Sequence, residues 1–181
     1  MSALSSEDKT ARARQRLLDK AAEMSLGKYI RKFVARDFQA MIRAEAAAQP
    51  AGYTPAIVDG KLTQVYRRVG ECVCVTCGRV GPWKSWTDSD RMNGGHFVGG
   101  RSQSIVLTEE NIAPQCAWCN KHESGARAEY RMWMLAVRGK ETVDRLERQR
   151  HADIRFTRDE LVDKRLEYRA RLKAAETRML D

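Results

Sequence analysis

Apolar residues recur about every three or four positions through the first quarter of the chain, which predicts helices there. A first helix, capped by Ser6, is expected to run through Leu17 and Leu18 and to end before Gly27. A second helix is expected to carry one apolar stripe, made of Tyr29, Phe33, Phe38, Met41 and Ile42. Residues 48–52 interrupt this pattern with Pro and Gly, which is typical of a linker.

The middle of the chain instead shows short apolar runs separated by turn residues, which predicts strands. Asp59-Gly60 lies between two such runs and fits a type I′ hairpin turn, because both residue types tolerate positive φ. A helix over residues 62–68 is the competing interpretation. The remaining predictions for this region are a strand at 71–75, a loop over 79–93, a short strand at 94–98 and its returning strand at 104–107.

The last third of the chain returns to helical periodicity. Helices are expected over 126–137, ended by Gly139, and over 141–150. Thr157 and Glu160 form a capping box for a last helix that reaches about Met179. Its apolar stripe is expected to pack on the N-terminal helices or on another subunit; the stripe consists of Leu161, Tyr168, Leu172, Ala175 and Met179. The pattern therefore predicts an α+β protein with a helical extension and linker at 1–52, a core at 53–150 and a C-terminal helix at 151–181.

Composition indicates which location and which class of partner suit this protein. The mean hydropathy is -0.59, and no apolar run approaches the roughly 20 residues that a membrane span needs. The N-terminus lacks the basic-then-apolar order of a signal peptide, so a cytoplasmic location without membrane contact is expected. The formal net charge of +9 favours a polyanion such as nucleic acid as the partner, although a merely solvated charged surface fits the composition equally well.

Cysteines supply the most specific chemical signal. Cys74 and Cys77 form one Cys-x-x-Cys pair, and Cys116 and Cys119 form a second. In a reducing compartment such pairs favour metal over disulfides, and four thiolates fill the tetrahedral shell of a structural zinc. Their wide separation suits a treble-clef arrangement, in which a hairpin is inserted between a zinc knuckle and a helix. Cys72 is then the spare thiol, and a ligand set that uses Cys72 with Cys77 remains the alternative.

Three polar residues near the cysteine pairs are candidates for catalysis. His96 can accept a proton from water near neutral pH, so it is a candidate general base for phosphodiester hydrolysis. Asn111 precedes the second cysteine pair and Asn120 follows it. An amide can hold a loop in register, and its carbonyl oxygen can ligate a hard divalent cation.

These residues together resemble a known family. Gly95-His96-Phe97, Glu110-Asn111-Ile112, Gln115-Cys116, Cys119-Asn120, Ser124-Gly125 and Tyr130 are similar to the NinG/Rap family of lambdoid phage recombination nucleases, and more broadly to zinc-stapled HNH (ββα-metal) endonucleases. The resemblance implies that His96 is the general base, that Asn111 pins the loop between two strands, and that Asn120 ligates a catalytic Mg²⁺ or Mn²⁺. Many HNH enzymes carry a further metal ligand directly before the base. This chain has Gly95 there, so the first ligand stays open among Asp88, Asp90, Asn93 and Glu123, of which Asp90 is the preferred candidate.

The resemblance also implies an activity. It points to a structure-specific DNA endonuclease that cuts Holliday junctions and D-loops, acts as a homodimer, and comes from a phage or a prophage in its bacterial host. Candidate DNA contacts are Arg101, Lys121, Arg127 and Arg131. The alternative is a non-catalytic zinc module that binds DNA or a protein partner, and the glycine before His96 is the feature that favours it.

Overall fold

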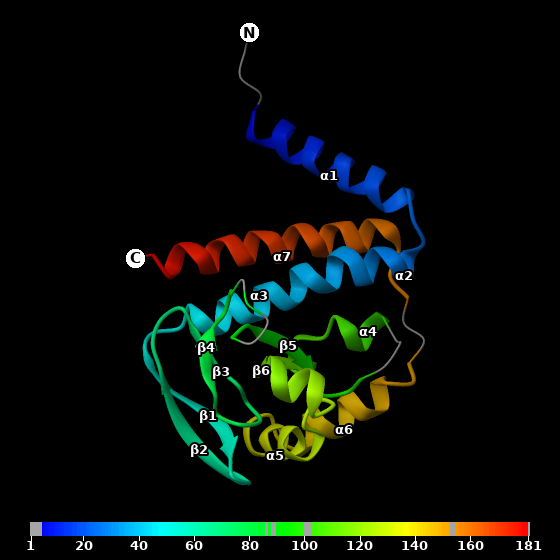
Figure 1. The fold of residues 1–181 in the computed structure, drawn as a ribbon. Helices are drawn as coiled ribbons and strands as arrows, with labels where there is room; N and C mark the ends of the chain where they lie inside the picture. The colour runs from blue at the N-terminus through cyan, green and yellow to red at the C-terminus, as the bar shows by residue number, and fades with distance from the viewer. Residues whose placement is uncertain (1–4, 86, 88–89, 100–102, 153–154, 181) are drawn as a thin grey trace.

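The computed structural model describes residues 5–85, 87, 90–99, 103–152 and 155–180. Figure 1 shows long helices along one side of the molecule and a body of short strands and helices on the other. The fold is therefore mixed α+β, as predicted, and its strands form small antiparallel sheets. Among the described residues, no helix combines the length and the apolar composition needed to cross a bilayer.

The helical side consists of α1 (Ser6–Ala22), α2 (Leu26–Tyr29), the π-helical turn η1 (Ile30–Val34), α3 (Ala35–Ala47) and α7 (Arg158–Arg178). The apolar stripe of α7 packs on the N-terminal helices: the Phe38 and Tyr168 rings lie 4.9 Å apart, and Leu161 is fully buried in the same cluster. Arg165 adds an ion pair to Asp37 at 2.7 Å. Of the two partners predicted for this stripe, the structure shows the N-terminal helices of the same chain.

The ends of the outer helices follow local capping rules. Thr157 and Glu160 form the predicted capping box at the start of α7. Ser5, rather than Ser6, caps α1, because its hydroxyl accepts a hydrogen bond from the Asp8 N–H and the Asp8 carboxylate accepts one from the Ser5 N–H. The prediction of the α1 cap was therefore wrong by one residue.

The first hairpin has the turn that its sequence predicts. Strands β1 (Gly52–Val58) and β2 (Lys61–Arg67) pair antiparallel around Asp59 and Gly60, whose φ angles are 48° and 72°. Positive φ at both central residues is the geometry of a type I′ turn. The competing helix over residues 62–68 is wrong.

The second pair of strands forms the knuckle that carries the first two cysteines. Strands β3 (Glu71–Val73) and β4 (Val80–Pro82) pair antiparallel, and Gly78 between them has a φ of 75°. The predicted strand at 71–75 is confirmed over 71–73. The loop predicted over 79–93 is wrong at 80–82, because β3 offers that segment a partner from outside its own sequence, and at 92–93, where the next strand, Met92–His96, begins.

The third hairpin carries the candidate catalytic residues. Strands β5 (Met92–His96) and β6 (Ile112–Cys116) pair with His96 opposite Ile112 and Met92 opposite Cys116. The returning strand predicted at 104–107 is wrong, because that segment contains the short helix α4 (Gln103–Val106), followed by the 3-10 turn η2 (Glu109–Asn111). A short apolar run does not distinguish a strand from a buried helical turn, and β6 takes the place beside β5 that residues 104–107 were expected to fill.

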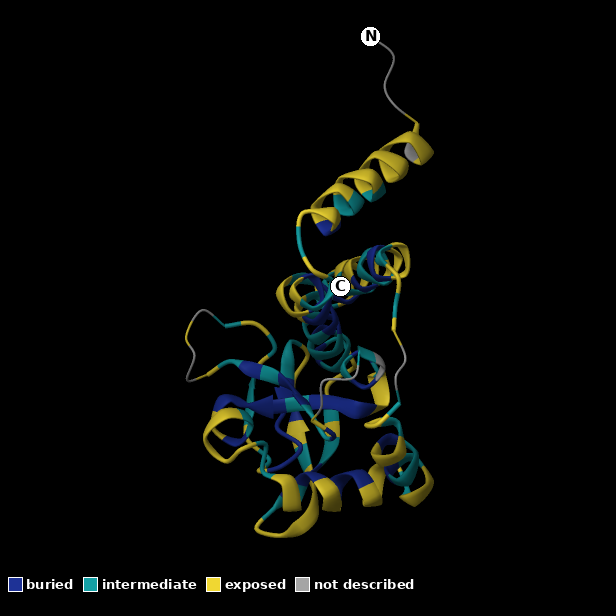
Figure 2. Ribbon diagram, turned by 90° about the vertical axis from the view of Figure 1, so that its right-hand side faces the viewer, coloured by how far each residue is buried: buried dark blue, intermediate teal, exposed yellow. Residues whose placement is uncertain are grey.

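Backbone hydrogen bonds and helices join the hairpins into one body. The Val75 N–H donates to the Pro114 carbonyl at 3.1 Å, and the Ile57 N–H donates to the Val75 carbonyl at 2.9 Å. The π-helical turn η3 (Trp118–His122) follows β6, and α5 (Arg127–Val137) and α6 (Lys140–Gln149) complete the body. Figure 2 shows that buried residues concentrate in this body, whereas α1 is mostly exposed.

Candidate metal centre and catalytic hairpin

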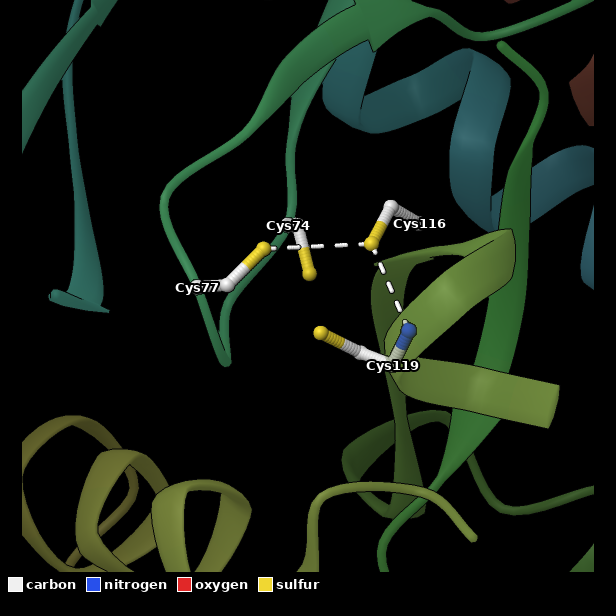
Figure 3. A group of neighbouring side chains, drawn as sticks. All are labelled: Cys74, Cys77, Cys116 and Cys119. Carbon is white, nitrogen blue, oxygen red and sulfur yellow. Dashed lines mark hydrogen bonds between the residues drawn. The ribbon is translucent and has the colours of Figure 1, made fainter. Parts of the chain in front are cut away.

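The four cysteines of the two Cys-x-x-Cys pairs meet in space. Their Sγ atoms all lie within 4.8 Å of one another, and Figure 3 shows them turned toward a common centre. The Sγ atoms of Cys77 and Cys116 are 3.8 Å apart. A tetrahedral zinc with Zn–S bonds of about 2.3 Å requires sulfurs about 3.8 Å apart, so this spacing fits the ion. The cluster is consistent with a structural zinc.

Local structure prepares the four thiols for a metal. Cys74 and Cys77 lie in the β3–β4 knuckle, Cys116 ends β6, and Cys119 lies in η3. The Cys119 N–H points to the Cys116 sulfur at 3.5 Å (Figure 3), which suits a thiolate at that position. Hydrogen bonds with Cys116 and Cys77 lower the pKa of the Cys74 thiol, whereas hydrogen bonds with Cys116 and Cys74 raise the pKa of Cys77 and burial raises that of Cys119. Without a metal the cluster therefore favours a thiolate at Cys74, and a zinc ion would have to displace protons from the thiols of Cys77 and Cys119.

The fifth cysteine does not belong to the cluster. Cys72 is buried, and its thiol donates to the Arg43 carbonyl at 3.2 Å. Burial raises the pKa of Cys72 to about 12, which keeps it protonated. The alternative ligand set with Cys72 is therefore excluded by position, because the sulfurs that converge are those of the other four cysteines.

His96 lies at the end of β5, largely shielded from solvent. Its Nε2 atom is 3.0 Å from the Val106 carbonyl oxygen. A carbonyl oxygen only accepts hydrogen bonds, so Nε2 carries the proton and Nδ1 keeps its lone pair. Burial lowers the pKa of His96, which favours the neutral imidazole.

Asn111 fastens the loop that follows His96. It is fully buried, and its Oδ1 accepts the Val98 N–H at 2.8 Å. Its Nδ2 donates to the carbonyls of Val98 at 3.0 Å and Ile105 at 2.9 Å. The side chain thereby holds both ends of the loop, and Ile105 directly precedes the Val106 carbonyl that orients His96. These hydrogen bonds are compatible with the loop-pinning role that the resemblance implied for Asn111.

Position 95 is closed to any side chain by Gln115. A Cβ atom built on Gly95 would lie 1.9 Å from Gln115 Oε1, well inside van der Waals contact. Gln115 is fully buried, and its Nε2 donates to Thr76 Oγ1 at 3.2 Å and to the Gly125 carbonyl at 2.9 Å. The sequence pointed to the glycine and included Gln115 in the family motif, but gave Gln115 no role; its signal was a polar residue in an otherwise apolar strand.

Gln115 connects the cysteine-bearing β3–β4 knuckle to the β5–β6 hairpin. Thr76, which receives its hydrogen bond, also lies 3.3 Å from Cys74 Sγ. On the other side, the Tyr130 hydroxyl donates to the Gly95 carbonyl at 2.9 Å. The strand that carries His96 is therefore held from both sides, by the metal knuckle and by α5.

The two predicted cation ligands lie in different places. Asn120 follows Cys119 in η3, and the turn that ends this segment reaches Gln115 through Gly125. Asp90 lies beyond the Met92 end of β5, opposite to His96, and its carboxylate accepts a hydrogen bond from Thr87 at 3.0 Å. Four residue steps of a strand span about 13 Å, so the structure does not bring Asp90 to His96.

The structure describes three of the four predicted DNA contacts. Arg101 lies outside the described residues. Lys121, Arg127 and Arg131 are all exposed, the first on η3 and the other two on α5.

Comparison with known proteins identifies the relatives of this chain. Residues 10–178 match the family model described as "Bacteriophage Lambda NinG protein". "Protein ninG" of Escherichia phage lambda is 31% identical over 101 residues, which cover 55% of this chain and 46% of that protein. "Protein ninG" of Salmonella phage P22 is 30% identical over the same shares of each chain. The matched segment thus spans about half the length of these curated relatives, and no solved structure matches the chain significantly.

A match over nearly the whole chain, with the four clustered cysteines inside it, shows that this protein belongs to the NinG family of phage proteins.

Proposed function

We propose that this protein is a metal-dependent endonuclease that hydrolyses phosphodiester bonds in branched DNA, with His96 as its general base. The observation that carries the proposal is the state of the His96 ring. Its Nε2–H is used by the Val106 carbonyl, so Nδ1 is left with a lone pair for the proton of an attacking water. The lowered pKa keeps that nitrogen unprotonated at neutral pH.

The order of elements supports an HNH-type core. A strand ending in His96, a pinned loop ending in Asn111, a second strand and the helical segment with Asn120 follow one another along the chain. The cysteine cluster supports this unit, because Gln115 donates a hydrogen bond to Thr76 in the knuckle and packs against Gly95 in the hairpin. Cys74, Cys77, Cys116 and Cys119 would hold the zinc, and four thiolates would leave it no open position, so its role would be structural.

A divalent cation needs few protein ligands here. Mg²⁺ is commonly held by one or two side-chain oxygens, with water and substrate phosphate completing its shell. Asn120 is the side chain that we assign to it, because Asp90 lies at the far end of β5. Such an ion would supply stabilisation of the charge that develops on the leaving oxygen.

Branched DNA as the substrate and a symmetric homodimer follow from the resemblance to recombination nucleases. The net charge of +9 suits a DNA ligand, and paired cuts in a four-way junction suit two-fold symmetry. The relatives are phage proteins, so the proposed site of action is the cytoplasm of an infected or lysogenic host. The second candidate is a zinc module that binds DNA or protein without cutting. Gly95 favours it, since the residue directly before His96 carries no carboxylate.

Replacement of His96 by Ala tests the proposal. We expect cleavage of a synthetic four-way junction in Mg²⁺ or Mn²⁺ to fall by at least about 10²-fold, the usual contribution of a general base. The control is His122→Ala, an exposed histidine on η3 that stacks on Trp118. Both variants should keep their zinc. Equal cleavage rates for wild type and His96→Ala would rule out His96, and tight junction binding without any cleavage by wild type would favour the binding module.

The lowered pKa of His96 predicts an unusual pH profile. The base works in its neutral form, so activity should persist below the ordinary histidine pKa of about 6.5 and disappear as the pH falls through the folded-state value. The stability of the folded protein should also fall as the pH falls. Below about pH 6.5 the histidine takes up a proton in the unfolded chain, whereas His96 of the folded chain, largely shielded from solvent, resists protonation. Rates at fixed metal concentration and unfolding curves for wild type and His96→Gln measure both effects. An acidic limb centred above pH 6.5 would contradict the assignment.

A further inference from the structure

A cavity of about 380 Å³ lies beside the segment that follows His96. Its floor is formed by residues 97–99, and its walls come from α5 and from the end of α6. The floor and the α5 wall are fixed to one another, because the Phe97 and Tyr130 rings pack 5.7 Å apart and the Tyr130 hydroxyl bonds to Gly95. The cavity is therefore a preformed feature at the edge of the catalytic hairpin.

The cavity is strongly positive. Three guanidinium groups line it, those of Arg127, Arg131 and Arg150, against one carboxylate, that of Glu147. Glu147 is already bound to Arg131. In the part of the chain that the structure describes, Arg127 and Arg150 have no ion-pair partner. Two positive charges thus remain uncompensated, and His151 on the same wall offers a further hydrogen-bond donor.

The shape and chemistry of the cavity suit a phosphate. Guanidinium groups present parallel N–H donors that match the oxygens of a phosphate. Arg127 is the first residue of α5, an eleven-residue helix, where the free N–H groups and the helix dipole also favour an anion. Gly99 leaves the opposite side open: a Cβ built there would have only Arg127 Nη2 nearby, at 4.0 Å. A backbone phosphate can therefore approach both the arginine and the main chain.

We infer that this cavity binds one phosphate of the DNA backbone close to the phosphate that is cut. The inference rests on the proposed function for the identity of the cut phosphate, and it deepens that function by assigning a binding subsite to the same hairpin. The residues that carry the subsite are Arg127 and Arg150, with Arg131 held in place by Glu147. Free inorganic phosphate shares this chemistry, so the test must separate it from DNA.

The test measures binding of full-length protein to a four-way junction, with Ca²⁺ in place of Mg²⁺ to prevent cleavage. Arg127→Gln and Arg150→Gln should each weaken binding by roughly tenfold, as expected for the loss of one charged hydrogen bond. Each should also lower the slope of log affinity against log salt by about 1. The matched control is Arg148→Gln, which removes the same charge from α6 outside this cavity and should have little effect.

Junctions with single methylphosphonate linkages then locate the contact. One neutralised phosphate should weaken binding of wild type and leave binding of Arg150→Gln nearly unchanged, since the variant has already lost that contact. Variants that bind with the affinity, salt slope and methylphosphonate profile of wild type would overturn the inference. The inference would also be overturned if Arg150→Gln lost the binding of inorganic phosphate but bound DNA as tightly as wild type.

This test is independent of the cleavage assay. A protein that shows the methylphosphonate response but cuts no DNA would refute the proposed nuclease and retain the phosphate site. A protein that cuts junctions while Arg127→Gln and Arg150→Gln bind normally would refute the phosphate site alone.

Discussion

Cys116→Ser is expected to lose zinc and to unfold the body formed by the three hairpins. Cys116 supplies a sulfur to the cluster, ends β6 opposite Met92 and is itself buried. Three remaining thiolates leave the shell of the ion incomplete, and structural zinc sites contribute on the order of 10 kcal/mol to folding. The free energy of unfolding of a typical protein is only about 5–15 kcal/mol, so loss of the zinc would remove most or all of it. Partial or full unfolding should follow.

Metal analysis and thermal unfolding of the purified variant measure this effect. The matched control is Cys72→Ser, which changes a buried cysteine outside the cluster and keeps a donor for the Arg43 carbonyl. It should retain the zinc content of wild type and lose only about 1 kcal/mol, because a hydroxyl costs more to bury than a thiol even when it keeps its hydrogen bond. A Cys116→Ser protein that is folded, zinc-free and as stable as wild type would refute the structural zinc.

Gly95→Ala is expected to destabilise the protein by about 3 kcal/mol, at the upper end of overpacking effects. The added methyl group would coincide with Gln115 Oε1, and Gln115 cannot withdraw without breaking its hydrogen bonds to Thr76 and Gly125. Gly95→Asp should be worse still, since it also buries a carboxylate. An acidic residue at this position, common in HNH enzymes, would therefore fail to supply a metal ligand in this chain.

Chemical unfolding compares these variants with a matched glycine. Gly52→Ala is the control, because a Cβ at Gly52 would meet nothing closer than the Pro50 carbonyl at 3.9 Å. The double variant Gly95→Ala, Gln115→Ala should be more stable than the sum of the two single losses by about 2 kcal/mol, since removal of Gln115 removes the clash. Strictly additive losses, or a Gly95→Ala protein as stable as wild type, would show that Gln115 does not close position 95.

The four cysteines that could hold a metal were predictable because each pair is recognised from the spacing of neighbouring residues. The two-residue spacing of each pair places both sulfurs on one turn, whatever the rest of the fold does. The hairpin at Asp59-Gly60 and the capping box at Thr157 were predictable for the same reason, since each is decided by adjacent residues. The helical periodicity of the N- and C-terminal segments was also sufficient to locate α1, α3 and α7.

Apart from the one-residue shift of the α1 cap, the errors concern segments whose structure depends on distant partners. Residues 104–107 had the composition of a strand, but the partner of β5 is β6. The carbonyls of Ile105 and Val106 instead accept hydrogen bonds from Asn111 and His96. The strand at 80–82 likewise exists only because β3 is present to pair with it.

Residue type and short spacing were enough to indicate which residues can hold a metal and which histidine precedes the loop that Asn111 holds. How these residues are arranged relative to one another depends on the folded chain. The tertiary structure placed Gln115 over Gly95, directed the Nε2–H of His96 to the Val106 carbonyl, and brought Arg127 and Arg150 to one cavity. Each of these contacts joins residues from different elements, and chain folding, rather than local pattern, brings such residues within reach of one another.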